Sequence, residues 1–435
     1  MKNKSIKIAM IGLGTVGSGV WKILTQQRQL LEQRIGVPIE IKWVAVKSPR
    51  KKRPLAIPKT CMVSQINSIF LDPEIQIVVE LMGGVTEAKE HVLQALKHQK
   101  HVVTANKALI AECGSELFHA AREAKRDLCF EAAVGGGIPV LRALREGLAG
   151  NHLNSIYAII NGTSNFILTE MFQQQMDFSV ALKKAQSLGF AEADPSFDIQ
   201  GIDAAQKLAI LIAMAYGVEI PAQNIHTEGI ESVSLLDLQY AQRFGYQVKL
   251  LAIAKSQQGK IQARVHPTMI PENSMLAAVQ AENNAVLFDG DFVGETLLYG
   301  KGAGSEPTAS AVVGDIIEIA RNIKAGVSEA VAPLGVNVES LRPARIEPMD
   351  MLKSEYYLRF QVTDRPGVLA KITQILSQLQ ISISSVYQHG HEAGGKVSVV
   401  VLTHLAKEKN LQKAIIKINQ QSFVYAPTTL IRIED

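Results

Sequence analysis

The sequence is poor in cysteine and in aromatic residues, and neither sign of charge is in large excess. Its 435 residues include three cysteines, Cys61, Cys113 and Cys129, which are far apart and form no C-x-x-C pair. An odd number of separated cysteines is typical of a reduced protein and favours neither a disulfide scaffold nor a zinc site. Lysine and arginine exceed aspartate and glutamate by 45 − 41 = 4, which is too little to indicate nucleic-acid binding.

Long apolar runs are also missing. No stretch reaches the roughly 18 residues that a membrane helix requires. The apolar run that begins near Lys7 is broken by Gly12, Gly14, Gly17 and Gly19 and has no convincing cleavage site, so it is not typical of a signal peptide. We therefore expect a cytoplasmic protein with no membrane partner and no nucleic-acid partner.

The first part of the chain alternates short apolar runs with helical patterns. The apolar runs are residues 6–11, 39–46, 75–82 and 101–105. Strands that alternate with helices indicate an α/β fold with a Rossmann-type, doubly wound parallel sheet. We assign residues 1–132 to this domain.

The rest of the chain has a different order. Residues 133–303 mix helical patterns with strand-like runs, which indicates an α+β domain. A helical pattern, predicted to span 199–216, dominates its middle. After a linker at 341–354, residues 355–435 follow the order βαββαβ of a ferredoxin-like unit, with helices predicted over 366–379 and 406–419.

A glycine motif, G-x-G-x-x-G, stands between the first strand and the first helix. Its glycines permit a tight turn and close approach of a pyrophosphate, and the helix N-terminus supplies amide donors. The alternative is a flexible loop. We predict a dinucleotide site formed by Gly12, Leu13, Gly14, Thr15, Val16 and Gly17.

A basic run follows the second strand. Five of the seven residues from Lys47 to Arg53 are basic, and the carboxylate that usually binds the ribose of NAD is missing there. Positive charge suits a 2′-phosphate, so NADP(H) is favoured, with NAD(H) as the second possibility. The other interpretation is a solvated basic loop without a ligand.

Asp198, Asp203 and Lys207 lie together in the run FDIQGIDAAQKLAILIAMAYG. Asp203 and Lys207 are four residues apart and so share one helix face. Burial of a lysine favours its neutral form, which suits proton transfer, and this lysine leads directly into an apolar run. Spacing alone favours an ordinary i,i+4 ion pair on a surface helix.

A turn rich in carboxylates precedes this run, at Glu192 and Asp194. Carboxylates beside a lysine could hold a substrate amine close to a proton donor. The alternative is a helix cap, because Asp-Pro followed by Ser often precedes a helix.

These segments, in this order, resemble homoserine dehydrogenase of the form that has a C-terminal ACT domain. The matching runs are GLGTVG (12–17), VVELMGG (78–84), TANKALIA (104–111), EAAVGGGIP (131–139), NGTSNFIL (161–168), LGFAEADPSFDIQGIDAAQKLAIL (188–211) and GAGSEPTASAV (302–312). The resemblance covers nearly the whole chain. Lys47 is a departure, since an arginine commonly ends the second strand in this family.

The resemblance implies interconversion of L-homoserine and L-aspartate 4-semialdehyde with NAD(P)(H), in the aspartate-derived route to threonine, methionine and isoleucine. It makes Lys207 the proton donor, places Lys107 between nicotinamide and substrate, and lets Asp198 support Lys207. The expected substrate ligands are Gly189, Glu192 and Asp203.

The resemblance also implies further ligands and an oligomer. Cofactor contacts are expected at Lys47, Arg50, Gly83, Lys107 and Gly304, so that residues 304–340 rejoin the first domain. A sodium ion is expected on carbonyl oxygens of Glu131, Val134, Gly136 and Ile138. The family forms its dimer through the middle domain, so a homodimer or homotetramer is expected.

The ACT-like segment is expected to bind an amino acid, with L-threonine as feedback inhibitor. The effector residues would be Asp364, Gly367 and Val368, at the turn from first strand to first helix. Pro366 suits a first helical turn, and the amides there could take a carboxylate while Asp364 accepts the ammonium group. The alternative is a purely structural or dimerisation unit.

Three other functions compete with this interpretation. Another Rossmann dehydrogenase that acts on an amino acid would not predict Glu192, Asp203 and Lys207 together with TANK. A non-catalytic amino-acid sensor is disfavoured by the intact lysines. A nucleic-acid role for the basic run lacks interleaved aromatic residues and any reader motif.

Overall fold

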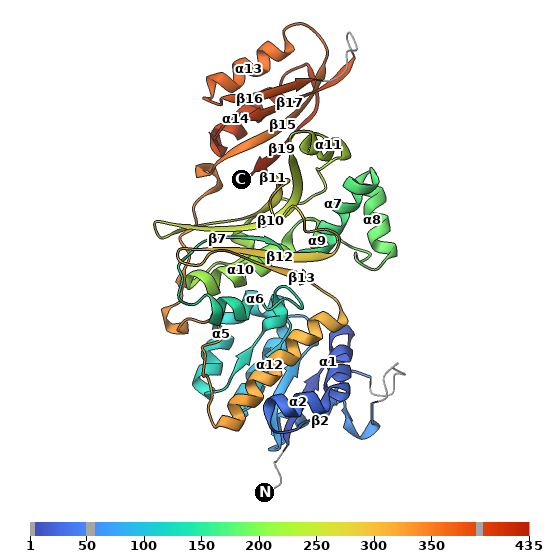
Figure 1. Cartoon of the computed structure of the whole chain (residues 1–435), viewed down its shortest axis with the longest axis vertical. Coiled ribbons are helices and arrows are strands. Elements are labelled where there is room, and N and C mark those ends of the chain that lie inside the picture. Colours follow the sequence, from blue (N-terminus) through green and yellow to red (C-terminus); the bar gives the residue numbers. More distant parts are fainter. Residues whose placement is uncertain (1–4, 49–56, 389–394, 435) are drawn as a thin grey trace. The chain divides into compact units, whose positions relative to one another are not determined.

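The computed structural model describes residues 5–48, 57–388 and 395–434, and it divides into two compact units. Unit 1 comprises residues 1–156, 205–225 and 283–344, and unit 2 comprises residues 157–204, 226–282 and 345–435. Figure 1 labels the elements that are used below. No described helix combines the length and the apolar character that crossing a bilayer demands.

Unit 1 contains a six-stranded parallel sheet in the order β3-β2-β1-β4-β5-β6. This is the doubly wound order of dinucleotide-binding folds. Four of the strands have interior runs that are buried on both faces, as parallel strands covered by helices are. The strands are β1 (Ile6–Ile11), β2 (Ile39–Ala45), β3 (Met62–Val63), β4 (Ile75–Glu80), β5 (His101–Thr104) and β6 (Leu128–Cys129).

Helices cover this sheet, and the last of them comes from far along the chain. They are α1 (Thr15–Gln26), α2 (Arg28–Ile35), α3 (Asn67–Leu71), α4 (Thr86–Lys97), α5 (Lys107–Ala124) and α12 (Ser305–Ala325). Helix α12 lies beside α1 (Figure 1), because Gly19 leaves room for Ala309 to pack closely. Both helices contribute to one hydrophobic core with strand β1.

The remaining elements of unit 1 are short or belong to a hairpin. The antiparallel hairpin joins β12 to β13, and β13 lies at the edge of its sheet. The elements are η2 (Glu131–Ala133), α6 (Val140–Arg142), the π-helix η3 (Ala143–Gly147), β12 (Asn283–Gly290), β13 (Gly294–Lys301), β8 (Val218–Glu219) and β14 (Arg342–Pro343). Strand β7 (Leu153–Ile159) and helix α10 (Ile202–Tyr216) run across the boundary between the units, and short 3₁₀ turns stand at Lys59–Cys61, Ala222–Asn224, Val338–Ser340 and Met349–Met351.

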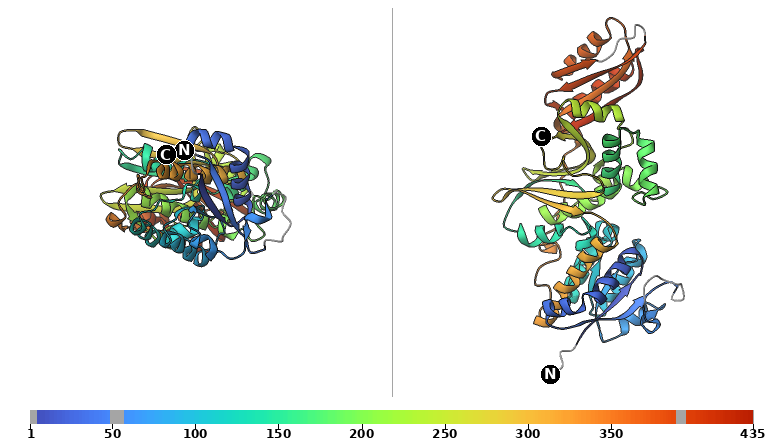
Figure 2. Two further views of the ribbon diagram at one scale, coloured as in Figure 1. Left: turned by 90° about the horizontal axis from the view of Figure 1, so that it is seen from below. Right: turned by 45° about the vertical axis from the view of Figure 1, so that its right-hand side comes forward.

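Unit 2 is built on strands in the order β10-β11-β19-β15-β17-β16. Helices α13 and α14 share one core with strands β15 and β17; Figure 2 shows this segment in orange and red. The elements are α7 (Gly162–Gln174), α8 (Phe178–Ser187), α9 (Ser196–Ile199), β9 (His226–Thr227), α11 (Leu235–Arg243), β10 (Tyr246–Gln257), β11 (Lys260–Pro271), β15 (Lys353–Thr363), α13 (Val368–Gln378), β16 (Ile383–Gln388), β17 (Lys396–Thr403), β18 (Ala406–Lys407), α14 (Glu408–Asn419) and β19 (Val424–Ile433).

The predicted fold class is confirmed, and two details of it are wrong. The helix predicted over 199–216 is interrupted at Gly201, which has φ +81° and separates α9 from α10. The ferredoxin-like segment has the predicted order of elements, and its last strand also joins it to the rest of unit 2, since β19 pairs with β15 on one side and in parallel with β11 on the other. Pro366 lies in the turn before α13 rather than in its first helical turn.

Candidate active site

The glycine motif forms a tight turn between β1 and α1. Gly12 has φ +104°, and a Cβ atom there would lie 2.5 Å from the carbonyl oxygen of Leu81. A Cβ on Gly17 would lie 2.6 Å from the Gly12 carbonyl oxygen, whereas a Cβ on Gly14 would meet no atom within 4 Å. Two glycines are thus required by packing, while Gly14 borders open space at the start of helix α1. This is the arrangement that admits a phosphate to a helix N-terminus.

Helix α12 begins next to the same turn. The Ser305 hydroxyl donates a 2.7 Å hydrogen bond to the carbonyl oxygen of Thr15. Gly304, with φ +115°, is the residue just before the helix. Gly304 therefore lies close to the glycine loop.

Of the basic run from Lys47 to Arg53, the structure describes Lys47 and Ser48. The Lys47 side chain is 88% exposed, and its Nζ lies 3.8 Å from a carboxylate oxygen of Glu87. Such an exposed pair is weak, so the ammonium group remains available to a ligand. Arg50 and the basic residues up to Arg53 lie outside the described residues.

Lys107 is positioned by polar residues at the ends of strands β4 and β5. Thr104 donates to the fully buried Glu80 at 2.6 Å, and Asn106 N–H donates to the Thr104 hydroxyl at 3.0 Å. Asn106 then caps helix α5 by accepting from the Leu109 N–H, and its amide donates to the Gly84 carbonyl. Lys107 is the first residue of that helix, directly after this cap.

Glu80, Thr104 and Asn106 were missed as site residues by the sequence analysis. They stand inside the quoted VVELMGG and TANK runs, so the motif was visible although the hydrogen bonds were not. Their role is to tie the loop of Gly83 and Gly84, both left-handed, to the start of α5.

The loop predicted to bind sodium contains two left-handed glycines in succession, Gly135 at φ +76° and Gly136 at φ +57°. Both side-chain oxygens of Glu131 are occupied, because they accept from the N–H groups of Leu141 and Arg142. A ligand at Glu131 would therefore use the backbone carbonyl, whose hydrogen bond from Val134 is long at 3.4 Å. Carbonyl oxygens are suitable ligands for a hard cation, so this loop fits such an ion.

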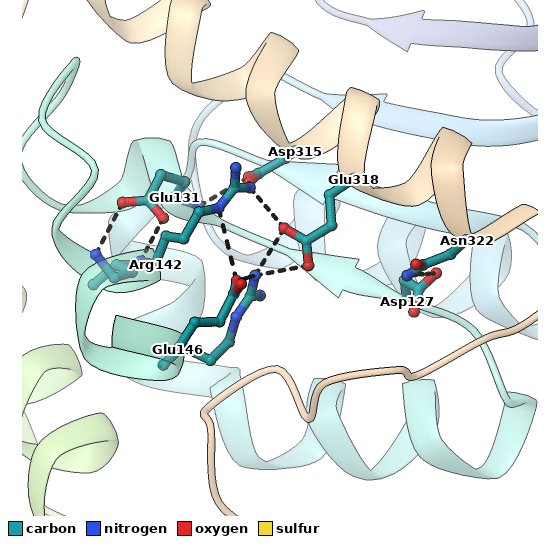
Figure 3. Close-up of polar contacts among 9 residues, drawn as sticks. Asp127, Glu131, Arg142, Glu146, Asp315, Glu318 and Asn322 are labelled. Carbon is teal, nitrogen blue, oxygen red and sulfur yellow. Dashed lines mark hydrogen bonds and ion pairs between the residues drawn. The ribbon is translucent and has the colours of Figure 1, made fainter. Parts of the chain in front are cut away.

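A network of arginines and carboxylates supports this loop (Figure 3). Asp315, 2% exposed, accepts the Glu131 N–H at 2.9 Å. Arg142 and Arg145 donate to Glu318 at 2.6 and 2.7 Å. The pKa of Asp315 is raised to about 8, mainly because the side chain is buried and secondly because the carboxylate of Glu131 is near. The possible ligand atoms of Cys129, Asp315 and Glu318 lie within 4.8 Å of one another, but Glu318 is already paired with Arg142 and Arg145.

Asn161 brings together, in unit 2, Asp198, which was predicted to support Lys207, and Asp203, which was predicted to bind the substrate. The Asn161 amide donates to Asp198 at 2.7 Å and to Asp203 at 2.9 Å. The Thr163 hydroxyl also donates to Asp198 at 3.2 Å. Asp203 is 2% exposed. Two carboxylates held by one amide form a site that can accept an ammonium group.

Asn161 and Thr163 were also missed by the sequence analysis as site residues, although NGTSN was quoted as a motif. Asn161 caps helix α7 by accepting from the Ser164 N–H at 2.8 Å. Its oxygen is thus committed to the helix, which leaves both amide hydrogens for the carboxylates.

Glu192 and Gly189 lie in the exposed turn between α8 and α9. Gly189 has φ +78°, which only glycine adopts readily. The Glu192 carbonyl accepts from Gln186 at 3.1 Å. Asp194 accepts from the N–H and the hydroxyl of Ser196, the first residue of α9, but the N-cap of that helix is Pro195, without a side-chain cap.

Lys207 lies on helix α10, one turn after Asp203, and is partly buried. The residues that follow it, Leu208 to Ile212, are all buried. The apolar environment expected from the sequence is therefore present along this helix.

The predicted effector residues lie at the start of α13. Gly367, with φ +92°, is the residue before the helix, and a Cβ there would meet no atom within 4 Å. Asp364 N–H donates to the Gly395 carbonyl, and Asp364 accepts a long, 3.5 Å contact from Gln388. Val368 is buried.

Comparison with known proteins decides the family. Three family models match: the homoserine dehydrogenase NAD-binding domain at residues 12–131, homoserine dehydrogenase at 139–317, and the ACT domain at 356–421. Homoserine dehydrogenase from Pseudomonas aeruginosa is 43% identical over 432 residues, which are 99% of each chain. The chain belongs to the homoserine dehydrogenase family.

Solved structures of homoserine dehydrogenases agree with this assignment. A crystal structure from Thiobacillus denitrificans has a TM-score of 0.93 and 45% identity, with 99% of each chain covered. A hyperthermophilic archaeal homoserine dehydrogenase in complex with NADPH has a TM-score of 0.60 and 28% identity, and it covers 73% of this chain and 98% of its own. As a homoserine dehydrogenase, the chain is an oxidoreductase with a Rossmann-type NAD(P)-binding domain and a C-terminal ACT domain.

Proposed function

We propose that this chain interconverts L-homoserine and L-aspartate 4-semialdehyde, with NADP(H) preferred over NAD(H), in the aspartate-derived route to threonine, methionine and isoleucine. The observation that carries the proposal is the pair of carboxylates, Asp198 and Asp203, held by Asn161. An amino acid substrate presents an ammonium group, and such a carboxylate pair binds it through charge-assisted hydrogen bonds. Glu192 and Gly189 complete the binding of the amino acid end.

The reacting end of the substrate is assigned to the lysines. Reduction of the aldehyde places negative charge on its oxygen, and Lys207 donates a proton to that oxygen. Lys107, fixed by the Asn106 cap at the start of α5, orients the substrate against the nicotinamide. Asp198 supports Lys207. When bound, the nicotinamide cofactor supplies or accepts the hydride.

The cofactor is assigned to the glycine loop and the basic run. In this assignment Gly12 to Gly17, Gly83 and Gly304 provide backbone contacts, and the positive charges of Lys47 and Arg50 would favour a 2′-phosphate. The NADPH complex of the archaeal family member supports this preference. Replacing Arg50, Lys51, Lys52 and Arg53 by neutral residues is expected to weaken NADPH binding far more than NADH binding. Equal losses for both cofactors would contradict the preference.

A sodium ion, an oligomer and three domains are further parts of the proposal. The carbonyls of Glu131, Val134, Gly136 and Ile138 would hold the ion. The exposed tip of the β12–β13 hairpin, where Phe292 is 86% exposed, supports a homodimer or homotetramer formed through the middle domain. The domains are 1–132 with 304–340, 133–303 and, after the linker 341–354, 355–435. Sedimentation of the purified protein measures the oligomer.

L-Threonine is the proposed feedback inhibitor, bound at Asp364, Gly367 and Val368. The open space beside Gly367 at the start of helix α13 supports this assignment. A helix N-terminus favours the carboxylate of an amino acid.

A steady-state assay with aspartate 4-semialdehyde and each reduced cofactor tests the function. The expected result is oxidation of NADPH that depends on the semialdehyde, with a higher kcat/KM than for NADH. Absence of turnover with both cofactors, in a folded protein and with sodium present, would overturn the proposal and favour a sensor role.

A further inference from the structure

Three buried ion clusters join the ACT domain to the rest of unit 2, and one of them leads to the substrate carboxylates. Arg432, 1% exposed, lies on the C-terminal strand β19. Its guanidinium donates to both oxygens of Glu228 at 2.9 and 2.8 Å and to both oxygens of Glu408 at 3.0 and 2.7 Å. Glu408 begins ACT helix α14, whereas Glu228 follows strand β9. Arg432 therefore bridges the two domains.

The backbone around Glu228 is held against strand β11. Strand β9 pairs in parallel with β11, and the Glu228 N–H donates to the Val265 carbonyl at 2.8 Å. Strand β11 also pairs with β19 next to Arg432, at Thr268. The side chain of Glu228 is thus held by β19 and its backbone by β11, and these two strands are neighbours in one sheet.

The residues after Glu228 contact the segment that carries Asp198. Ile230 N–H donates to the Ile199 carbonyl at 2.9 Å. Gly229 is pressed against the same peptide, because a Cβ there would lie 2.5 Å from the Ile199 oxygen and 2.8 Å from Gln200 Cα. Ile199 is the immediate neighbour of Asp198, which Asn161 holds beside Asp203. The whole chain of contacts lies within unit 2.

We propose that Glu228 is a positioning residue: through its ion pair with Arg432, the last strand of the ACT domain holds the 228–230 loop and so sets the position of Asp198 in the substrate site. This inference rests on the proposed function, since it takes Asp198 and Asp203 as the site of the substrate ammonium group. It requires no ligand on the ACT domain. An effector that moved β19 would act on substrate affinity by this route.

The alternative is that the ion pair only docks the ACT domain. A matched pair for comparison exists in the same junction: Arg359 of β15 donates to Asp237 at 2.6 and 2.9 Å, and Tyr357 donates to Asp237 as well. Asp237 is fully buried and lies in the first turn of α11, not on the loop that bonds Ile199. Breaking either pair weakens docking, but of these two carboxylates it is Glu228 that lies on the loop whose backbone hydrogen-bonds Ile199, next to Asp198.

The test compares Glu228→Gln with Asp237→Asn in the full-length chain, each against wild type. Both substitutions keep the side-chain shape and remove the charge, so both are expected to lower Tm. Glu228→Gln is expected to raise the KM for L-homoserine by about tenfold and to lower kcat as well, because Asp198 both binds the substrate and supports Lys207, whereas the KM for NADP⁺ should change less than about twofold. Asp237→Asn is expected to change the homoserine KM less than about twofold.

A second variant and a binding measurement keep the inference testable if Glu228→Gln does not fold. Arg432→Lys retains the charge but loses the bidentate geometry, so a smaller rise in homoserine KM is expected. For the Glu228 and Arg432 variants, the rise in Tm that homoserine and NADP⁺ cause should become smaller as the homoserine KM becomes larger. Equal effects of the Glu228 and Asp237 variants on homoserine KM would overturn the inference. A wild type without turnover would instead overturn the proposed function.

Discussion

At the scale of single residues, Lys207 is the residue on which the proposed chemistry most depends. It is partly buried at the start of a run of buried apolar residues on α10. Lys207→Ala is expected to lower kcat by about 10²-fold or more, because the proton donor to the aldehyde oxygen is lost. Binding of NADPH, measured by fluorescence, should be unchanged.

The control for this variant is Lys184→Ala. Lys184 is 42% exposed on α8 and pairs with Glu170 at 2.6 Å. It should retain wild-type kcat. A Lys207→Ala enzyme that keeps more than about a tenth of wild-type kcat would rule out general acid catalysis by this residue.

The burial of His266 predicts how the stability of the protein depends on pH. It is fully buried on β11, and burial, together with Arg432 and Arg264, lowers its pKa well below the usual value, against an opposing effect of Glu228. Below about pH 6.5 the unfolded chain therefore binds a proton at this residue that the folded chain does not. The free energy of unfolding contributed by His266 is present above that pH and is lost as the pH falls.

The measurement is Tm as a function of pH for wild type and for His266→Asn. Between pH 7 and pH 5, wild-type Tm should fall more steeply than that of the variant, since the variant has no imidazole to protonate when unfolded. From pH 7 to pH 8 the two curves should run parallel. Parallel curves over the acidic range as well would show that His266 does not contribute.

At the scale of elements, two glycines of the turn between β1 and α1 are expected to have different roles: Gly12 in packing and Gly14 in binding of the cofactor. A Cβ on Gly12 would clash with the backbone of Leu81 on the neighbouring strand's loop, whereas one on Gly14 would point into open space. Gly12→Ala is therefore expected to lower Tm by several degrees. Gly14→Ala should keep Tm within about 2 °C of wild type, as surface substitutions usually do, and yet weaken NADPH binding.

Calorimetric titration of NADPH, together with Tm without ligand, checks both variants. The two glycines would be shown to have the same role if both variants lost stability and affinity in equal proportion. Gly14→Ala with wild-type NADPH affinity would mean that the space beside Gly14 is not where the pyrophosphate binds.

The element that the sequence described least well is β19. Its residues read as the last strand of a ferredoxin-like unit, which is correct for its pairing with β15. Its second pairing, with β11, places Arg432 beside Glu228 and Glu434 beside Arg264 and Lys255. The pairing with β11 involves two residues of β19, Arg432 and Ile433, which are too few for a periodic pattern in the sequence to indicate it.

At the scale of the whole chain, this junction affects how regulation can be tested. Deleting the ACT domain near Pro348 would leave Asp237, Arg264 and Glu228 without Arg359, Glu434 and Arg432. Breaking a buried ion pair by removing one partner costs about 3–5 kcal/mol. We expect the truncated chain to aggregate or to melt far below wild type, as light scattering and calorimetry would measure.

A point substitution is the better test of threonine binding. L-Threonine should inhibit the wild type and raise its Tm, since a ligand at 100 times its Kd stabilises by about 2.7 kcal/mol. Asp364→Asn removes the proposed acceptor of the ammonium group while the junction stays intact, so both effects should be lost with normal basal kcat. A wild type that shows neither inhibition nor a threonine-dependent Tm would contradict the sensor assignment.

The sequence by itself determined the doubly wound sheet, the glycine loop, the ferredoxin-like order and the family, because each depends on local periodicity or on contiguous motifs such as GLGTVG and TANK. Only the tertiary structure decided which distant residues meet. Asn161 reaches Asp198 and Asp203 across about 40 positions, and Arg432 reaches Glu228 across 204. Polar contacts between remote segments leave no periodic trace in a sequence, since a buried arginine or asparagine is stable only with partners that folding supplies.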